Sequence, residues 1–153
     1  MAFRLTVAAD GFAGGASIPR RFTCDGENVS PALRWTGQPA ETKSFALIMD
    51  DPDAPGGTWN HWLVWDIPAS DHSISEGAEP GAPAKSGKND FGELGYGGPC
   101  PPRGKPHRYF FRLFALNVPS LGLLAGAKRP ALEKALRKHI IAKDSYTGRY
   151  GRA

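Results

Sequence analysis

The run Ser44-Phe45-Ala46-Leu47-Ile48-Met49 is followed at once by Asp50-Asp51-Pro52-Asp53-Ala54-Pro55-Gly56-Gly57. The first stretch is continuously apolar after its serine, which is typical of a central β-strand buried on both faces. The second stretch indicates a loop with little conformational freedom, because each proline fixes φ and removes a backbone donor. We therefore predict a buried strand over residues 43–49 that ends in a rigid loop carrying carboxylates.

Shorter apolar or alternating runs predict further strands on both sides of this one. They cover residues 3–8, 33–35, 59–67 and 107–117. One helix is expected over residues 129–143, where Leu132, Leu136 and Ile140 recur at every fourth position. Residues 77–106 form a long loop, and its length together with its embedded aromatic residues favours an ordered, functional loop.

The chain has 153 residues, which suits one domain, so residues 1–153 are expected to form a single unit. Its 19 glycines and 14 prolines are spread along the whole length, which favours many turns and short strands over long helices. No match to a P-loop or a dinucleotide fingerprint is present, and no cofactor is expected.

The net charge is +4, which raises the question of nucleic acid or an anionic membrane as a partner. No reading helix, aromatic stacking platform or zinc spacing accompanies the basic residues, so we expect no nucleic-acid partner and at most a peripheral membrane contact. No apolar run approaches the roughly 20 residues of a membrane span, and no signal peptide opens the sequence. The expected location is the cytoplasm.

Cys24 and Cys100 are the only two cysteines. A disulfide between them would close a large loop and stabilise the fold by about 4 kcal/mol in the chain-entropy model. A cytoplasmic location argues for free thiols instead. The sequence leaves both possibilities open.

His61 and His107 each lie near the beginning of a predicted strand and follow a loop rich in glycine or proline. Strand alternation places His61 with Leu63 and Trp65, and His107 with a second row of apolar residues, on core-facing sides. Asp51 would meet His61 if the strands on either side of its loop are neighbours, and a carboxylate raises the pKa of an imidazole. Two such histidines with backbone N–H groups would make a compact anion site.

Each of these residues also has a purely structural interpretation. A histidine on an apolar face is usually a hydrogen-bonded core residue, and the Asp-Pro-Asp segment could be only a turn. A catalytic metal would find enough ligands in two histidines and a carboxylate, but no HxxxH or HxD spacing is present, and no metal is expected. Covalent catalysis lacks a GxSxG motif, and Cys100 has no obvious activating base.

Two stretches, Phe22-Thr23-Cys24-Asp25-Gly26-Glu27-Asn28 and Asn89-Asp90-Phe91-Gly92, resemble the bacterial branch of the phosphatidylethanolamine-binding proteins, also called Raf-kinase-inhibitor-like proteins. Four further motifs resemble the family as a whole. The motifs are Asp51-Pro52-Asp53-Ala54-Pro55, Trp59-Asn60-His61-Trp62, Gly98-Pro99-Cys100-Pro101-Pro102 and Gly104-Lys105-Pro106-His107-Arg108-Tyr109. The resemblance implies a mainly β fold, with a β-sandwich-like body of two antiparallel sheets and a C-terminal α-helix near a ligand pocket. The segment after Lys143 is short and basic, which puts a long C-terminal lid over that pocket in doubt.

The resemblance also implies which residues surround the ligand. Asp51, His61, His107 and Tyr109 would contact an anion, which the backbone at Cys100 would face, while Trp59 and Pro102 would form the pocket wall. Asp53, Pro55 and Arg108 would support these residues from behind, and a cis peptide bond is expected before Pro55.

The expected function is a non-enzymatic binding protein for a small anionic or phosphorylated ligand, such as phosphate or a phospholipid headgroup. The alternative is a regulatory protein that inhibits a kinase or protease through the pocket and its loops. A protein partner and a homodimer are both compatible with the sequence.

Overall fold

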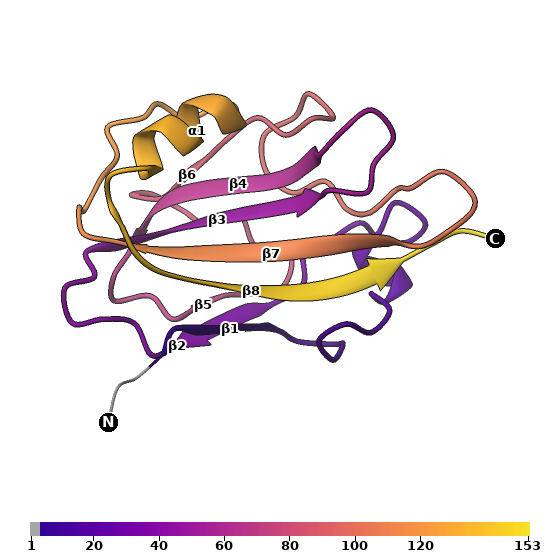
Figure 1. Cartoon of the computed structure of the whole chain (residues 1–153), viewed down its shortest axis with the longest axis horizontal. Helices are drawn as coiled ribbons and strands as arrows, with labels where there is room; N and C mark the ends of the chain where they lie inside the picture. Colours follow the sequence, from indigo (N-terminus) through magenta and orange to yellow (C-terminus); the bar gives the residue numbers. More distant parts are fainter. Residues whose placement is uncertain (1–3) are drawn as a thin grey trace.

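Two antiparallel sheets and one short helix make up the part of the chain that the computed structural model describes, residues 4–153 (Figure 1). The larger sheet has the strand order β6-β4-β3-β7-β8, and the smaller has the order β1-β2-β5. The strands are β1 (Thr6–Ala9), β2 (Leu33–Thr36), β3 (Ser44–Asp51), β4 (Trp59–Pro68), β5 (Ser73–Ile74), β6 (Lys85–Ser86), β7 (His107–Leu116) and β8 (Ile140–Tyr150). The helices are the 3-10 turn η1 (Arg20–Phe22) and α1 (Arg129–Leu136). The predicted mainly β fold with two antiparallel sheets is confirmed.

Strand β3 is the centre of the larger sheet, and all 8 of its residues are buried. The reason is that it pairs with β4 on one side and β7 on the other, while both of its faces are covered. The prediction of a central, doubly buried strand is therefore confirmed. The strand continues through Asp50 and Asp51, which the sequence had assigned to the following loop, because both still pair with β4.

The two faces of the larger sheet contact two separate hydrophobic cores. The inner core lies between the sheets and includes Trp35, Phe45, Trp62, Tyr109 and Phe111. The outer core lies beneath α1 and includes Ile48, Leu63, Trp65, Leu132 and Leu136. Helix α1 therefore covers β3 and β4 on the outer face and leaves much of β7 and β8 uncovered there (Figure 1).

The predicted helix over residues 129–143 is wrong in its second half. Helix α1 ends at Leu136, and Ile140 begins β8, which pairs with β7 from Leu116 to His107. Ile140 and Ile141 are β-branched residues that favour strands, and the long ladder with β7 outweighs the helical spacing. The helix also lies on the outer face, so the expectation that it lies near the pocket is wrong as well.

Two smaller expectations concern residues near the ends of elements. Phe3, which opened the first predicted strand, lies outside the described residues, and β1 begins at Thr6. The cis X-Pro bond is at Ala82-Pro83 and not before Pro55. The loop at Pro55 turns instead through Gly56 and Gly57, whose φ values of 83° and 122° suit glycine.

Within residues 4–153, no helix is long and apolar enough to cross a membrane.

Candidate functional site

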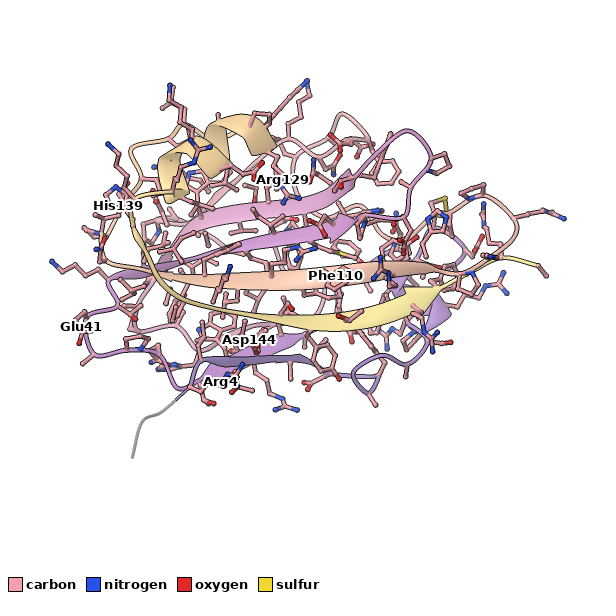
Figure 2. All side chains as sticks on the ribbon, viewed as in Figure 1. Arg4, Glu41, Phe110, Arg129, His139 and Asp144 are labelled. Carbon is pink, nitrogen blue, oxygen red and sulfur yellow. A yellow bond between two sulfur atoms is a disulfide. The ribbon has the colours of Figure 1, made fainter. Side chains whose placement is uncertain are left out.

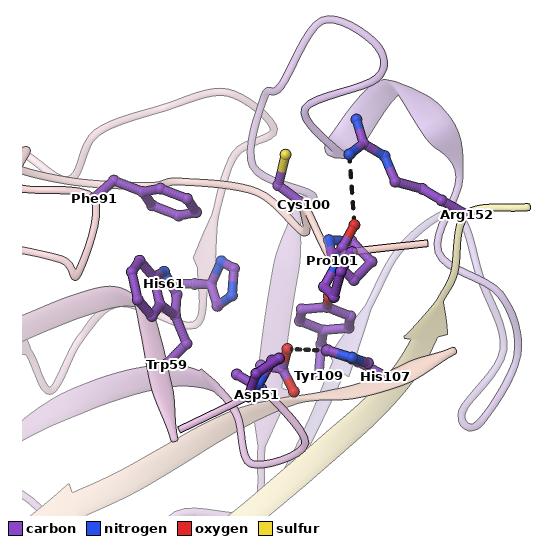
Figure 3. Close-up of a pocket in the computed structure, with 12 residues that line it drawn as sticks. Asp51, Trp59, His61, Phe91, Cys100, Pro101, His107, Tyr109 and Arg152 are labelled. Atoms are coloured by element: carbon purple, nitrogen blue, oxygen red, sulfur yellow. Dashed lines mark hydrogen bonds and ion pairs between the residues drawn. The ribbon is translucent and has the colours of Figure 1, made fainter. Parts of the chain in front are cut away.

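A cavity of about 470 Å³ opens at the end of the larger sheet where β3 ends and β4 and β7 begin (Figure 3). We call it the inner pocket, and its lining residues are Asp51, Ala54, Pro55, Trp59, His61, Phe91, Cys100, Pro101, Pro102, His107, Tyr109 and Arg152. The strands supply the polar groups, and the loops supply most of the wall. Polar side chains on a rigid sheet facing a largely apolar wall are a common arrangement for a small-molecule site.

Asp51 and His107 form a buried pair at the floor of the inner pocket. The two Asp51 oxygens have separate partners: Oδ2 lies 2.7 Å from His107 Nδ1, and Oδ1 accepts the backbone N–H of Asp53 at 2.8 Å. The carboxylate therefore fixes the imidazole on one side and the Pro-rich loop on the other. His107 Nδ1 donates in this pair, which leaves Nε2 available to a ligand.

His61 reaches the inner pocket through a β-bulge in β4. Met49 pairs with Trp62 and Asp50 pairs with Asn60, so His61 has no partner across the ladder with β3. Such a bulge adds one residue to a strand and redirects a side chain, which is common beside functional sites.

The bulge makes the predicted face of β4 wrong for Leu63 and Trp65, whereas Ile67 lies on the inner side as predicted, after a second register shift. Trp62 and Val64 belong to the inner core, whereas Leu63 and Trp65 belong to the outer core beneath α1. His61 and Trp62 therefore lie on the same side of the sheet although they are adjacent in sequence. The face predicted for β7, by contrast, is confirmed, since His107 is buried and Tyr109 and Phe111 lie in the inner core.

The hydrogen bond of His61 defines its tautomer. Its Nδ1 lies 2.6 Å from the Gly97 carbonyl oxygen, so Nδ1 carries the proton and Nε2 is left for the inner pocket. Burial lowers the pKa of His61, and the Gly97 carbonyl and the more distant Asp51 only partly oppose this effect. Asp51 and His61 thus meet in one pocket as expected, but the expected net rise in the pKa of His61 is wrong, because burial outweighs the charge of Asp51, whose hydrogen bond goes to His107.

Tyr109 contributes a buried hydroxyl group. Among the residues that the structure describes, this hydroxyl has no hydrogen-bond partner, although the side chain is fully buried. Burial raises the pKa of Tyr109, and the nearby Asp51 carboxylate adds to this through its negative charge and a contact too poorly aligned for an ordinary hydrogen bond, so the group remains a neutral donor. An unpaired buried hydroxyl is unfavourable by about 1–3 kcal/mol, which a ligand oxygen could recover.

The wall of the inner pocket opposite β3 is a loop. A disulfide and hydrogen bonds join this loop to the segment after η1. Cys24 and Cys100 form a disulfide, and the Cys24 N–H donates to the Pro99 carbonyl oxygen at 3.1 Å. The Gly98 N–H donates to Asn28 Oδ1 at 2.9 Å, and a side chain at Gly98 would lie 2.3 Å from that oxygen. Of the two possibilities left open for the cysteines, the structure contains the disulfide. The cytoplasmic location stays a prediction.

The mouth of the inner pocket has an aromatic side and a cationic side. Trp59 and Phe91 are 37% and 43% exposed, and their rings contact each other edge to face at 5.5 Å. Opposite them, Arg152 donates to the Pro101 carbonyl oxygen at 3.5 Å and forms an ion pair with Asp25 (Figure 3). A ligand entering the pocket therefore passes between apolar rings and a guanidinium group.

Asp53 and Arg108 lie outside the inner pocket and support its floor. The Arg108 guanidinium donates two hydrogen bonds of 2.9 Å to the Asp53 carboxylate, and the Arg108 backbone N–H donates a third. Hydrogen bonds from Arg108 lower the pKa of Asp53 to about 2. The pair joins the loop after β3 to the beginning of β7 and thereby holds Asp51 beside His107.

The inner pocket contains most of the residues named from the sequence. Asp51, Trp59, His61, Cys100, Pro102, His107, Tyr109 and Pro55 all line it, whereas Asp53 and Arg108 do not. Sequence reasoning missed Ala54, Phe91, Pro101 and Arg152 as lining residues. Phe91 could have been found as an aromatic residue in a Gly-rich loop, but no feature of the sequence marks Arg152 as a lining residue. Within residues 4–153, no three His, Cys, Asp or Glu side chains converge closely enough to hold a metal ion.

Comparisons with known proteins agree on one family. The family model described as phosphatidylethanolamine-binding protein matches residues 8–151. A UPF0098 protein of Aquifex aeolicus is 49% identical over 153 residues, covering 97% of this chain and 89% of its own. The crystal structure of CT736 from Chlamydia trachomatis, described as a putative homolog of these proteins, has a TM-score of 0.92 at 35% identity and covers 99% of this chain and 100% of its own. The crystal structure of Escherichia coli YbcL, described as a new member of the mammalian family, has a TM-score of 0.92 at 34% identity. It covers 98% of this chain and 99% of its own.

Proposed function

Because this chain belongs to the phosphatidylethanolamine-binding protein family, and so to a family of ligand-binding proteins, we propose that its inner pocket binds a small anionic or phosphorylated ligand as the monoanion. The observation that carries the proposal is the buried Tyr109 hydroxyl, which makes no hydrogen bond of ordinary geometry to the described residues although Asp51 lies near it, in a pocket that also presents two imidazole nitrogens. The prediction of membership in this family is confirmed, and the ligand is the part that we propose.

The hydrogen-bonding groups of the inner pocket match a phosphate monoester that keeps one proton. The Tyr109 hydroxyl is a donor, and His107 Nε2 donates when its ring is protonated. His61 Nε2 can only accept, because Nδ1 donates to Gly97 and the lowered pKa favours the neutral ring. A monoprotonated phosphate offers unprotonated oxygens to the two donors and one O–H to the acceptor.

The charge of Asp51 also favours the monoanion. Its carboxylate lies in the floor of the pocket with an exposed fraction of 3% and would repel a second negative charge on the ligand. Arg152 at the mouth attracts an anion but lies further out, in an ion pair with Asp25. The ester substituent of the ligand would lie toward Trp59 and Phe91, whose rings suit an apolar or cationic group.

We assign no catalytic step to this pocket. Both Asp51 oxygens are engaged in hydrogen bonds, and Cys100 is held in a disulfide rather than available as a nucleophile. The proposed mechanism is reversible binding through charge-assisted hydrogen bonds.

Calorimetric titration of inorganic phosphate and of phosphorylethanolamine tests the proposal at about pH 5.5 and about pH 8, on either side of the second pKa of a phosphate monoester, which is about 6. We expect tighter binding at the lower pH, where the monoanion of the ligand dominates. Tyr109→Phe removes one donor to a charged ligand without changing the shape of the side chain, and should weaken binding by about tenfold or more. His107→Ala should abolish binding.

His139→Ala is the matched control, because His139 lies outside the pocket, with its Nδ1 3.2 Å from Asn117 Oδ1. This variant should bind both ligands as the wild type does. NMR titration of the ring signals checks the protonation assumed for His61, which should titrate below the ordinary histidine value of about 6.5. Tighter binding of the dianion at high pH, or full affinity in Tyr109→Phe, would contradict the proposal.

A second candidate function is regulation of a protein partner through the pocket mouth. Phe91 and Leu94 are 43% and 62% exposed on the same loop, and Trp59 contacts Phe91. Exposed apolar side chains around a cavity favour docking of a peptide segment. Absence of phosphate and phosphorylethanolamine binding at millimolar concentration would favour this candidate, and Phe91→Ser should then reduce capture of the partner.

A further inference from the structure

A second group of polar side chains lies on the outer face of the larger sheet, away from the inner pocket. At its centre is Asp50, which is 1% exposed and points away from its neighbour Asp51. Arg112 donates from Nε and Nη2 to the Asp50 carboxylate at 3.0–3.2 Å, and Arg129 donates to it from Nη1. Arg129 Nη1 also donates to Asn60 Oδ1 at 2.9 Å. Figure 2 shows Arg129 at the end of α1 that faces β3 and β4.

A hollow of about 440 Å³ lies beside these two arginines. We call it the outer hollow, and its lining residues are Arg112, Phe114, Arg129, Lys143, Asp144 and Ser145. It occupies the border between the part of the sheet that α1 covers and the uncovered strands β7 and β8. Its cationic side chains come from α1, β7 and β8, three elements brought together only by the fold.

The two guanidinium groups are held in fixed positions by groups other than a ligand. Asp50 binds both of them, and the Arg112 guanidinium lies 4.5 Å from the ring centroid of Phe110, which supports it from one side. Their side chains remain 33% and 20% exposed. Among the described residues, neither Arg112 Nη1 nor Arg129 Nη2 donates a hydrogen bond, so each arginine keeps donors for another group.

The charges around the outer hollow leave it positive. One buried carboxylate, Asp50, faces two guanidinium groups, and Lys143 adds an exposed ammonium group. Glu133 lies 3.4 Å from Arg129 Nε and is half exposed, so solvent screens much of its effect. Asp144 turns its carboxylate toward β1, where Oδ2 accepts the Val7 N–H at 2.9 Å.

We propose that the outer hollow is a second anion-binding site, for the phosphate or sulfate group of a small ligand in its doubly charged form. Arginines held in place by a buried carboxylate bind such a group with little loss of side-chain entropy, and Nη1 of Arg112 and Nη2 of Arg129, both free among the described residues, offer N–H donors to its oxygens. Lys143 and Ser145 supply further donors on the β8 side. This proposal is independent of the ligand of the inner pocket.

The two sites differ in the charge of the anion that they select. The inner pocket contains an acceptor, His61 Nε2, and the carboxylate of Asp51, so it favours an anion that carries a proton. The outer hollow offers donors and an excess of positive charge. Sulfate has no proton to donate near neutral pH, so it should bind in the outer hollow and not in the inner pocket.

Sulfate titration followed by NMR tests the proposal, with sodium chloride added to the reference sample to match the ionic strength. The expected result is saturable shifts of the Nε–H signals of Arg112 and Arg129 and of the Ser145 amide at millimolar sulfate. Lys143→Glu should weaken this binding by about tenfold, since it removes one attraction and adds one repulsion, each worth up to about fivefold at an exposed position.

Lys138→Glu is the matched control, because Lys138 is an exposed lysine that does not line the hollow and the change in net charge is the same. It should leave sulfate affinity unchanged, and so should His107→Ala in the inner pocket. Equal weakening by the two lysine variants, or shifts that do not saturate, would overturn the proposal. Glycerol phosphate forms a second arm: equal affinity assigns the site to free oxyanions, and tighter binding assigns it to phosphate esters.

Discussion

Asp50 and Asp51 are adjacent residues of the same strand, yet they have opposite surroundings. Both are buried, at 1% and 3% exposure, because β3 is the central strand. Asp50 faces the outer side, where two arginines neutralise it. Asp51 faces the inner pocket, where its partners are one imidazole and one backbone N–H.

The difference separates a carboxylate that stabilises the fold from one that is available for binding. The outer pair of arginines more than balances the charge of Asp50, so removing the carboxylate leaves, among the described residues, Arg112 without an anionic partner and Arg129 with only the half-exposed Glu133. Asp51 instead shares a cavity with groups that are not fully hydrogen-bonded, such as the Tyr109 hydroxyl. We therefore expect changes at Asp50 to affect stability, and changes at Asp51 to affect ligand binding.

The largest change in stability is expected from the disulfide in the wall of the inner pocket. It tests the division between residues that stabilise the fold and residues that are available for binding, because the disulfide belongs to the pocket. Cys24 and Cys100 are 76 residues apart, and opening a loop of this size should lower the free energy of unfolding by about 4 kcal/mol in the chain-entropy model. Denaturant unfolding with and without a reductant measures the change, with the Cys24→Ser and Cys100→Ser double variant as an independent check. A loss well below 1 kcal/mol in both would show that the hydrogen bonds of the wall suffice to hold it.

Asp50→Asn should give the next largest effect. The substitution leaves two arginines beside a neutral amide, and breaking a buried ion pair typically lowers stability by 3–5 kcal/mol. We expect about 3 kcal/mol, at the lower end of this range, because both arginines are partly exposed. Denaturant unfolding gives the value.

Asp10→Asn is the control for this change. Asp10 forms an ion pair with Arg34 at 2.9 Å, with both side chains more than half exposed. The expected loss is below about 1 kcal/mol, which is usual for exposed pairs. Similar losses in the two variants would remove the distinction between the buried Asp50 cluster and a surface ion pair.

Asp51→Asn should change stability less and binding more. The amide oxygen can still accept from His107 Nδ1, but the amide nitrogen cannot accept the Asp53 N–H, so we expect a loss of about 1 kcal/mol. With the negative charge gone, the inner pocket should accept the phosphate dianion, and the preference for low pH should weaken. Calorimetry at about pH 5.5 and about pH 8 measures this preference. A stability loss as large as that of Asp50→Asn would contradict the division.

The strands, and most of the inner pocket, could be predicted from the sequence, because their signals are local. The apolar run before Asp50 marks the central strand, and alternation from His107 places His107 and Tyr109 on one face. The family motifs added Trp59, Cys100 and Pro102 to the predicted pocket.

The partners of these residues could not be predicted, because tertiary geometry decides them. The bulge at His61 changes the faces of β4 without any glycine or proline to mark it. It follows from the pairing with β3, in which Asp50 and Met49 are opposite Asn60 and Trp62. Ile140 continues a helical spacing but joins a strand, because the ladder with β7 is formed by residues far away in sequence.

The smallest effect concerns Asp53, the third carboxylate in the stretch that contains Asp50 and Asp51. Arg108 lowers the pKa of Asp53 from 3.8 to about 2, so folding favours the ionised carboxylate. Its contribution to stability should therefore be fully present above about pH 4 and lost as the pH falls through about 2. Because Arg108 is more than half exposed, solvent screens the pair, and we expect less than about 1 kcal/mol from it.

Denaturant unfolding of the wild type and Asp53→Asn over a pH series isolates this contribution. The difference between the two proteins should be constant above about pH 4 and should disappear below about pH 2, where Asp53 is mostly protonated in the wild type as well. Phosphate affinity near neutral pH should fall only slightly, since Asp53 supports the loop and does not line the inner pocket. A stability difference that persists below pH 2 would mean that Asp53 acts through loop geometry rather than through its charge. In that case it would belong with Asp51 as a residue that shapes the pocket, and not with Asp50 as one that balances arginines.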